Sequence, residues 1–214
     1  MPKRAGNARK PRRKPVQSRA QESSRAIQEA FVRLLDEKPY GQVTIREIAM
    51  VAGVGLGTFY DYFDSREALA RACVHLRTKA LLQALASTYS TIGAYDLEAG
   101  IAAAIDRQVA IFETAPREWR QHFLLERQKS DLKYYLSAYE AFVEAWRALI
   151  EGASDWPQDR PAADPARIMF TLIYGIFAHS HLRGGAGPDF GALRRDVTRA
   201  ALACLMAVGA EAAR

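Results

Sequence analysis

The chain has 214 residues, with 30 Lys and Arg, 24 Asp and Glu, two Cys and a formal net charge of +6. This length allows one large domain or two smaller ones with a real hydrophobic core. Cys73 and Cys204 are far apart, which excludes a metal-ligand or redox spacing and fits a reducing cytoplasm. The longest apolar run, Ile168 to Ala178, is too short to cross a bilayer, and no apolar signal segment follows the basic N-terminus. We therefore expect a cytoplasmic protein with no membrane contact.

The positive charge is concentrated at the N-terminus. Residues 1–19 contain eight Lys and Arg and no acid, so the remaining residues carry a net charge of −2. High polarity and several prolines disfavour packing or a helix here, and such cationic arms commonly lie along phosphates or enter a minor groove. A solubilising tail or a membrane-surface patch is the alternative. We expect residues 1–19 to be a flexible tail, with candidate DNA contacts at Arg12, Arg13, Lys14 and Arg19.

Helical periodicity begins at Gln21. Ile27, Phe31 and Leu34 repeat on one apolar stripe. The turn-forming stretch from Lys38 to Gly41 ends this first helix.

The next helix start has a complete set of signals. Thr44 and Glu47 have the spacing of a capping box, and Val43 and Ile48 occupy the two positions of a hydrophobic staple. The sequence therefore predicts a short helix from Ile45 to about residue 52, a break at Gly53, and a second short helix over residues 56–62. Two short helices joined in this way have the geometry of a helix-turn-helix.

The rest of the chain predicts helices only, because no segment alternates with the period of a strand. A long helix passes through Leu69 and Cys73 and continues beyond residue 80. Further helices are predicted over residues 95–113, 117–151 with a possible joint near 129–131, 165–183, and about 190–210. Residues 152–165 contain three prolines and form a predicted loop.

The segment TIREIAMVAGVGLGTFYDYFDSREAL, from Thr44 to Leu69, resembles the DNA-binding domain of the TetR family of bacterial transcriptional regulators. The resemblance covers roughly residues 20–75. The residues that match the family pattern are Thr44, Ile48-Ala49, Ala52-Gly53-Val54, Gly57-Thr58-Phe59-Tyr60, Tyr62-Phe63 and Ser65-Arg66-Glu67-Ala68-Leu69. It implies an all-α fold with an N-terminal three-helix DNA-binding domain, residues 20–70, joined to a larger helical ligand-binding and dimerisation domain, residues 71–214.

The resemblance also implies roles for individual side chains. Thr44 would hold a phosphate at a helix N-terminus, and Tyr60 would donate its hydroxyl to a phosphate. Arg46 would approach a base edge, where Arg suits guanine. Arg66, where the family usually has Lys, would reach the DNA backbone. The recognition helix adds Gly55, Leu56, Gly57 and Thr58 to the candidate contacts.

The predicted recognition segment departs from what base reading usually requires. Residues 55–61 contain no Lys, Arg, Asn or Gln, so bidentate base contacts from this helix are excluded. Residues 20–80 hold eight basic and eight acidic side chains and are neutral overall. We therefore expect affinity to depend on the cationic tail, and specificity on Arg46, thymine methyl contacts and DNA shape.

The last two helices each carry an apolar stripe that could form a four-helix dimer interface. The alternative is that this surface is buried only within one subunit. Helix-turn-helix proteins generally need two copies about one DNA turn apart, and the resemblance implies a homodimer. The candidate interface residues are Ile168, Leu172, Ile176, Val197, Ala201, Cys204, Leu205 and Val208.

Aromatic residues are frequent between these two regions. The resemblance implies a pocket among the middle helices for a small inducer that changes the spacing of the two DNA-binding domains. Such a lining suits a hydrophobic or aromatic ligand, while Arg120, His122 and Arg127 could bind an acid group or belong to the solvated surface. The candidate lining residues are Phe112, Trp119, Phe123, Tyr139, Phe142, Trp146 and Tyr174.

An enzyme is the main competing class. His179 and His181 are two residues apart and make a poor metal pair on a helix, and the glycines from 53 to 57 follow a predicted helix rather than a strand. We therefore expect no catalytic residue, metal or cofactor. The favoured function is that of a transcriptional repressor that binds operator DNA and is released from it by a small ligand. The alternatives are an activator of the same fold, or an architectural DNA-binding protein without a ligand.

Overall fold

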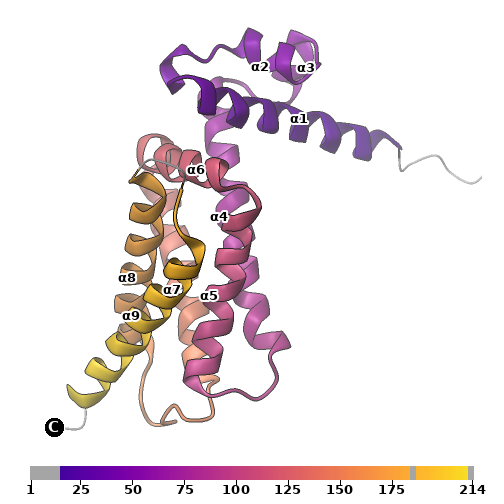
Figure 1. The fold of residues 1–214 in the computed structure, drawn as a ribbon. Helices are drawn as coiled ribbons and strands as arrows, with labels where there is room; N and C mark the ends of the chain where they lie inside the picture. The colour runs from indigo at the N-terminus through magenta and orange to yellow at the C-terminus, as the bar shows by residue number, and fades with distance from the viewer. Residues whose placement is uncertain (1–14, 184–186, 212–214) are drawn as a thin grey trace, which may run out of the picture. The chain divides into compact units, whose positions relative to one another are not determined.

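The computed structural model describes residues 15–183 and 187–211, and in these ranges it contains helices and no strand (Figure 1). The prediction of an all-α chain is thereby confirmed for this part of the sequence. The chain divides into two compact units, Met1–Arg66 and Glu67–Arg214. This division falls close to the boundary predicted between residues 70 and 71.

The first unit is built from three α-helices and a short 3-10 turn. These are α1 (Pro15–Glu37), η1 (Tyr40–Gln42), α2 (Ile45–Val51) and α3 (Leu56–Tyr62). α1 packs against both short helices. Its stripe residues Ile27 and Phe31 are fully buried together with Ile48 from α2 and Phe59 from α3, so the predicted amphipathic pattern forms this core.

Helix α1 begins at Pro15 rather than at Gln21, so residues 15–19 of the predicted flexible tail are helical. The physical reason is local. Proline is tolerated at the first helical position, where its missing N–H would have no partner, and Gln17, Arg19 and Ala20 have favourable or neutral helix propensity. Arg19 is exposed on this helix, whereas Arg12, Arg13 and Lys14 lie outside the described residues.

The second unit is a helical bundle. It contains α4 (Arg66–Thr91, of which Arg66 belongs to the first unit), α5 (Leu97–Thr114), α6 (Pro116–Lys129), α7 (Leu132–Glu151), α8 (Ala163–Leu182) and α9 (Phe190–Glu211). α8 packs against α6, α7 and α9, and α5 packs against α9. α6 runs across one end of the bundle (Figure 1). None of the helices within 15–183 and 187–211 has the length and apolar character needed to span a membrane.

The predicted joint near residues 129–131 is confirmed. α6 ends at Lys129, and the carboxylate of Asp131 accepts a hydrogen bond of 2.8 Å from the Tyr134 N–H, which starts α7. The following loop is shorter than predicted, since α8 begins at Ala163 instead of residue 165.

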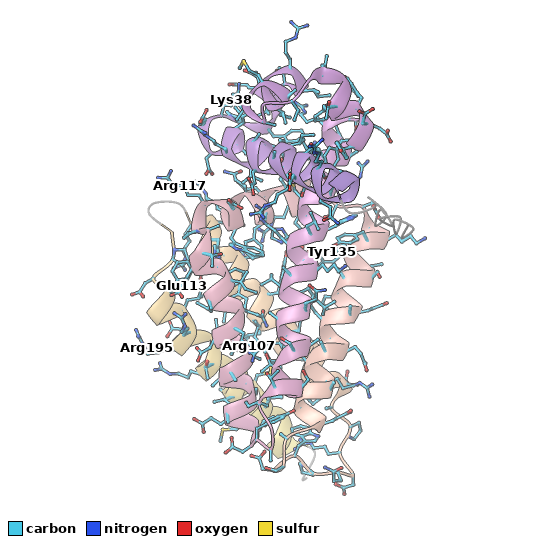
Figure 2. All side chains as sticks on the ribbon, turned by 90° about the vertical axis from the view of Figure 1, so that its right-hand side faces the viewer. Lys38, Arg107, Glu113, Arg117, Tyr135 and Arg195 are labelled. Carbon is cyan, nitrogen blue, oxygen red and sulfur yellow. The ribbon has the colours of Figure 1, made fainter. Side chains whose placement is uncertain are left out.

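Long-range contacts tie the surface of the bundle together. On α5, the Arg107 guanidinium donates to the hydroxyls of Ser87 (3.1 Å) and Thr91 (2.6 Å) on α4. Glu113, further along α5, forms an ion pair of 2.7 Å with Arg194 on α9. Both α5 side chains lie on the outside of the bundle (Figure 2). The charged face of α5 is therefore its outer face, and its apolar face lines the core.

Part of the predicted dimer stripe belongs to the core of a single chain instead. Val197, Ala201 and Leu205 on α9 are buried in the same cluster as Ile105 and Ile173. These three residues are corrected to intrachain core, because the apolar face of α9 packs on α5 and α8. The alternative considered for this stripe, burial within one subunit, is thus right for them.

Candidate nucleic-acid interface and internal cavity

The start of α2 is held by a network centred on Glu47. The Glu47 N–H donates to the Thr44 hydroxyl (3.3 Å), and the Thr44 N–H (3.0 Å) and hydroxyl (2.8 Å) donate to the Glu47 carboxylate. This is the capping box predicted from the sequence. Lys38, labelled in Figure 2, adds an ion pair with Glu47 at 2.5 Å. Sequence reasoning missed the part played by Lys38.

Arg66 closes the same corner from the first turn of α4. Its guanidinium donates to the carbonyl oxygens of Tyr40 (3.0 Å) and Val43, and lies 4.3 Å from the centre of the Tyr40 ring. The resemblance described above implied that Arg66 contacts the DNA backbone. In the structure its contacts are internal and fix the turn that precedes α2.

Gly53 forms the turn between α2 and α3. Its φ of 67° is in the left-handed region, where glycine is strongly favoured. The Gly53 N–H donates to the Met50 carbonyl (3.1 Å), and the Val54 N–H donates to the Ala49 carbonyl (3.0 Å). These two bonds are those of a Schellman motif, which ends α2 and redirects the chain into α3.

The two short helices leave most of the predicted contact residues accessible. Thr44, Arg46, Gly55, Leu56, Gly57 and Tyr60 are exposed, whereas Thr58 is half-buried. Tyr60 is 51% exposed, whereas Phe59 beside it is buried in the core. Met50 is also exposed and was missed. The only sequence signal for it is an apolar side chain outside the apolar stripe of α2.

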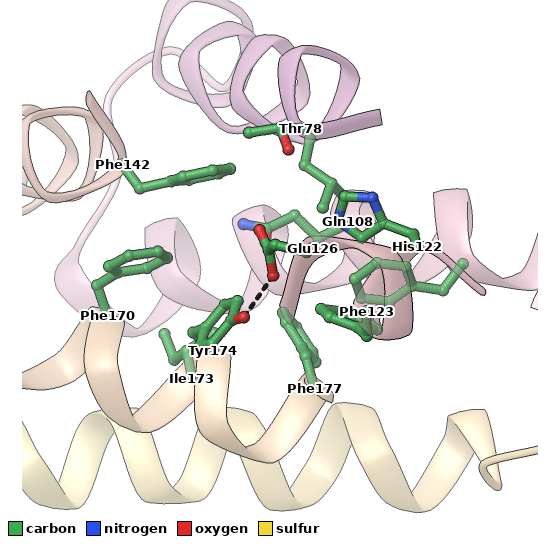
Figure 3. A pocket seen from close by; sticks show the side chains of 12 residues that line it. Thr78, Gln108, His122, Phe123, Glu126, Phe142, Phe170, Ile173, Tyr174 and Phe177 are labelled. Atoms are coloured by element: carbon green, nitrogen blue, oxygen red, sulfur yellow. Dashed lines mark hydrogen bonds between the residues drawn. The ribbon is translucent and has the colours of Figure 1, made fainter. Parts of the chain in front are cut away.

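The second unit encloses a cavity between α4, α5, α6, α7 and α8 (Figure 3). About 30 Å³ is open to the centre of a water-sized sphere, which is room for about two water molecules. Phe142 and Phe170 stack on one side, with centroids 5.0 Å apart. The lining residues are Thr78, Leu81, Gln108, Phe112, His122, Phe123, Glu126, Phe142, Phe170, Ile173, Tyr174 and Phe177.

A second, smaller cavity of about 20 Å³ adjoins the first. The two share Thr78, Glu126, Phe142, Phe170 and Tyr174 as lining residues. The second is completed by three residues of α7, namely Tyr135, Ala138 and Tyr139. Tyr135 is partly exposed and lies on the surface in Figure 2, so this cavity approaches solvent along α7.

The structure separates the predicted lining residues into two groups. Phe112, Phe123, Phe142 and Tyr174 line the first cavity, and Tyr139 lines the second. Trp119 and Trp146 line neither of these cavities. The Trp119 ring N–H donates to the Ile111 carbonyl at 3.1 Å, and Trp146 is fully buried in the core.

Sequence reasoning missed most polar groups of the cavity. Glu126 accepts a hydrogen bond from the Tyr174 hydroxyl, and burial raises the pKa of the Glu126 carboxyl. Burial, helped by the nearby charge of Arg77, lowers the pKa of His122 to about 3. A signal was present, since Trp119, His122, Phe123 and Glu126 follow the i, i+3, i+4, i+7 pattern of one helix face.

His179 and His181, near the end of α8, lie in different environments. His179 is exposed, whereas His181 is buried and its Nδ1 lies 2.8 Å from the Phe177 carbonyl oxygen. Over the described ranges, no three His, Cys, Asp or Glu side chains gather closely enough to hold a metal ion.

The Glu47 network gives a pH-dependent stability prediction. Hydrogen bonds from Lys38 and Thr44 lower the pKa of Glu47 from 4.5 to about 2. The ionised carboxylate therefore stabilises the folded state above pH 4.5, and this contribution is lost as the pH falls toward 2. We expect Glu47→Gln to lower the urea midpoint of the full chain near neutral pH, and the difference from the unaltered protein to shrink across this window.

Glu29→Gln is the matched control, because Glu29 forms only an exposed ion pair with Arg25 on α1. Its effect on the urea midpoint is expected to be much smaller. A Glu47→Gln difference that stays constant from neutral pH to pH 2 would show that the charge of Glu47 does not stabilise this corner.

Comparison with known proteins supports the first unit as a regulatory domain. Residues 27–73 match the family model described as bacterial regulatory proteins, tetR family. Over 55 residues the chain is 44% identical to an uncharacterised HTH-type transcriptional regulator of Mycobacterium tuberculosis (strain H37Rv), a match that covers 26% of this chain and 27% of the relative. The chain therefore spans about a quarter of the length of the curated relatives it matches.

Solved structures extend the likeness in fold to most of the chain. A TetR family transcription regulator from Marinobacter aquaeolei VT8 has a TM-score of 0.63 and 19% identity, covering 86% of this chain and 97% of its own. The fatty acid degradation regulator FadR from Bacillus halodurans has a TM-score of 0.68 and 18% identity, covering 84% of this chain and 94% of its own. Residues 27–73 therefore match the tetR family model of bacterial regulatory proteins, and the helical fold of the chain is similar to that of solved TetR family regulators.

Proposed function

We propose that this protein is a homodimeric transcriptional repressor in the cytoplasm that binds operator DNA through α2 and α3. A small apolar or aromatic molecule that enters the cavity of the second unit releases it from the operator. The observation that carries the proposal is the presence, in one chain, of an exposed helix-turn-helix and an aromatic-lined cavity. An architectural DNA-binding protein needs no such cavity, and the family assignment supports a regulator rather than an enzyme.

The glycines of the recognition helix support close approach to DNA. A Cβ atom added to Gly57 would meet no protein atom within 4 Å, so packing inside the chain does not require glycine there. Glycine inside a helix costs about 0.5–1 kcal/mol relative to alanine. The space left open over α3 suits a DNA backbone or base edge, with the exposed Tyr60 hydroxyl as a phosphate donor.

Phosphate binding near Thr44 would use the backbone more than the hydroxyl. The Thr44 hydroxyl already donates to Glu47, whereas the first N–H groups of a helix have no intrahelical partner. In the proposed complex these N–H groups contact a phosphate, and Arg46 extends from the same turn toward a base edge.

Ligand entry must rearrange the second unit. Sites for drug-sized ligands measure roughly 300–1,000 Å³, far above the space of about 30 Å³ in the first cavity. Phe142, Phe170 and Tyr174 line both adjoining spaces, so in the proposed mechanism a ligand that moves their rings enlarges both. Such a movement displaces α7 and α8, which supports a link between ligand binding and dimer geometry.

The proposed dimer uses the outward side of α8 and α9. Ile168 is 40% exposed and Met206 is 76% exposed, and Leu172 and Ile176 lie along α8 at four-residue spacing from Ile168. Cys204 is half-buried and stays in the proposed interface, whereas the side chain of Val208 lies outside the described residues. The buried α9 residues corrected above are replaced by Met206.

The first test concerns sequence-specific binding. Fluorescence anisotropy compares DNA from upstream of the protein's own gene with random DNA of equal length. We expect Arg46→Ala to lower the preference for the upstream DNA by about 1–3 kcal/mol, the usual worth of a bidentate base contact. Arg33→Ala is the control, because Arg33 on α1 pairs with Glu37 at 3.7 Å. Equal binding of both DNAs by the unaltered protein would overturn the proposed function.

The second test concerns the tail. Seven of the eight cations in residues 1–19 precede α1, and replacing these seven by Gln preserves chain length and the helix. Each phosphate contact contributes about 0.9 to the slope of log K against log salt. We expect the substituted protein to show a clearly flatter slope on both DNAs, with its preference for the upstream DNA retained. An unchanged slope would show that the tail does not contact phosphates.

The third test concerns the dimer. A charge at the centre of an apolar interface has no partner and disfavours association. We expect the double variant Leu172→Glu, Met206→Glu to be monomeric by light scattering and to lose operator binding. The control Glu144→Gln removes a charge from an exposed ion pair with Arg147 on α7 and should leave the dimer intact. A dimer that persists in the double variant would place the interface elsewhere.

A further inference from the structure

Glu126 is placed at the junction of the two cavities. It lines both cavities, and its carboxylate accepts a hydrogen bond from the Tyr174 hydroxyl (Figure 3). Among the described residues, no other group forms a hydrogen bond with this carboxyl. One carboxylate oxygen, Oε1, is therefore available to a ligand that reaches the junction.

The surroundings of Glu126 favour positive charge. No Lys or Arg occurs among the residues that line either cavity, and His122 is neutral near pH 7 because its pKa is lowered to about 3. Arg127, the next residue on α6, is exposed to solvent, and its charge, against the effect of burial, lowers the pKa of Glu126 and so favours the ionised carboxylate. The remaining walls are mostly aromatic rings, whose negative faces attract cations.

Further buried polar atoms that line the first cavity, including those of Gln108 and His122, have no hydrogen-bond partner within the part of the chain that the structure describes. Gln108 and His122 are each 3% exposed, and no group bonds to Gln108 Nε2 or to His122 Nδ1. The amide of Gln108 can turn by half a rotation, so it offers either a donor or an acceptor. Buried polar atoms without partners are rare in folded proteins, and here they face the same space as Glu126 (Figure 3).

We infer that the effector is an organic monocation, in which an ammonium-type group binds the Glu126 carboxylate while an aromatic or alkyl body lies among Phe142, Phe170 and Phe177. An ammonium group has three donors for Glu126 Oε1 and for the carbonyl of Gln108. A carboxylic acid of the same shape finds no cation in the lining and faces the Glu126 charge. This inference rests on the proposed ligand-controlled function and assigns the charge of its ligand.

The test uses three probes with one ring system and different charges. These are 1-naphthylmethylammonium, neutral 1-naphthylmethanol and the anion 1-naphthoate, titrated into the full-length protein by calorimetry at neutral pH. We expect the ammonium to bind about tenfold or more tighter than the alcohol, as a charge-assisted hydrogen bond in a partly buried site allows. The naphthoate should bind most weakly of the three.

Two variants assign the effect to Glu126. Glu126→Gln keeps the shape and can still accept from Tyr174, so we expect it to lose the ammonium preference and keep its affinity for the alcohol within about twofold. Glu113 lies on the surface of α5, pairs with Arg194 and lines neither cavity. Glu113→Gln therefore removes one negative charge outside the site and should leave all three affinities unchanged. Retained binding of the alcohol by Glu126→Gln also shows that the variant folds.

Three outcomes overturn the inference: a preference for naphthoate, an ammonium preference that survives in Glu126→Gln, or no binding of any probe. Operator anisotropy on the same protein distinguishes these from failure of the proposed function. If the alcohol alone releases the operator, ligand control stands and the assigned charge is wrong. If the protein shows no preference for the upstream DNA, the proposed function fails whatever the calorimetry gives.

Discussion

The Glu47 carboxylate organises the corner from which the helix-turn-helix begins. It accepts hydrogen bonds from the Thr44 N–H and hydroxyl and pairs with Lys38, while Arg66 binds the Tyr40 and Val43 carbonyls on the other side of the turn. Polar groups at a bend otherwise need water, and a bend held by water is less well defined. Because these partners fix the first residue of α2, and the left-handed Gly53 then fixes the start of α3, the proposed DNA contacts depend on this corner.

The cavity of the second unit shows the opposite arrangement. Gln108 and His122 have buried polar atoms that no group in residues 15–183 or 187–211 satisfies, and each such atom costs about 1–3 kcal/mol. The large aromatic core around Phe112 and Trp146 tolerates this cost without losing the fold. Polar groups kept unsatisfied inside an apolar core are what a ligand can satisfy, so the same residues that weaken the empty bundle would strengthen the occupied one.

Short-range signals in the sequence predicted most of the fold, and long-range packing accounts for the errors. The capping box at Thr44, the break at Gly53 and the joint before Asp131 each depend on residues within a few positions of one another, so sequence alone located them. Val197 and Trp146 were misplaced because an apolar stripe indicates which side of a helix is buried but not what covers it. Glu126 was missed since a charged residue is normally assigned to solvent, even though it shares a helix face with Trp119 and Phe123. The packing of α6 against α8 shows that this face points inward.

In the proposed complex the N-terminal cations supply most of the affinity for DNA, and the helix-turn-helix supplies the specificity. This division determines how a ligand changes DNA binding. If the cations before α1 supply the phosphate contacts while Arg46 and the exposed face of α3 supply the sequence preference, the two contributions respond differently to a change in dimer geometry. Contacts between a polar tail and phosphates tolerate displacement, because every phosphate along the duplex is equivalent. Contacts at base edges do not tolerate displacement, because both DNA-binding domains of a dimer must bind their half-sites at the same time. In the proposed mechanism a small rearrangement around Phe170 and Tyr174 therefore removes the preference for the operator before it removes binding to DNA, and the released protein stays on neighbouring sequence.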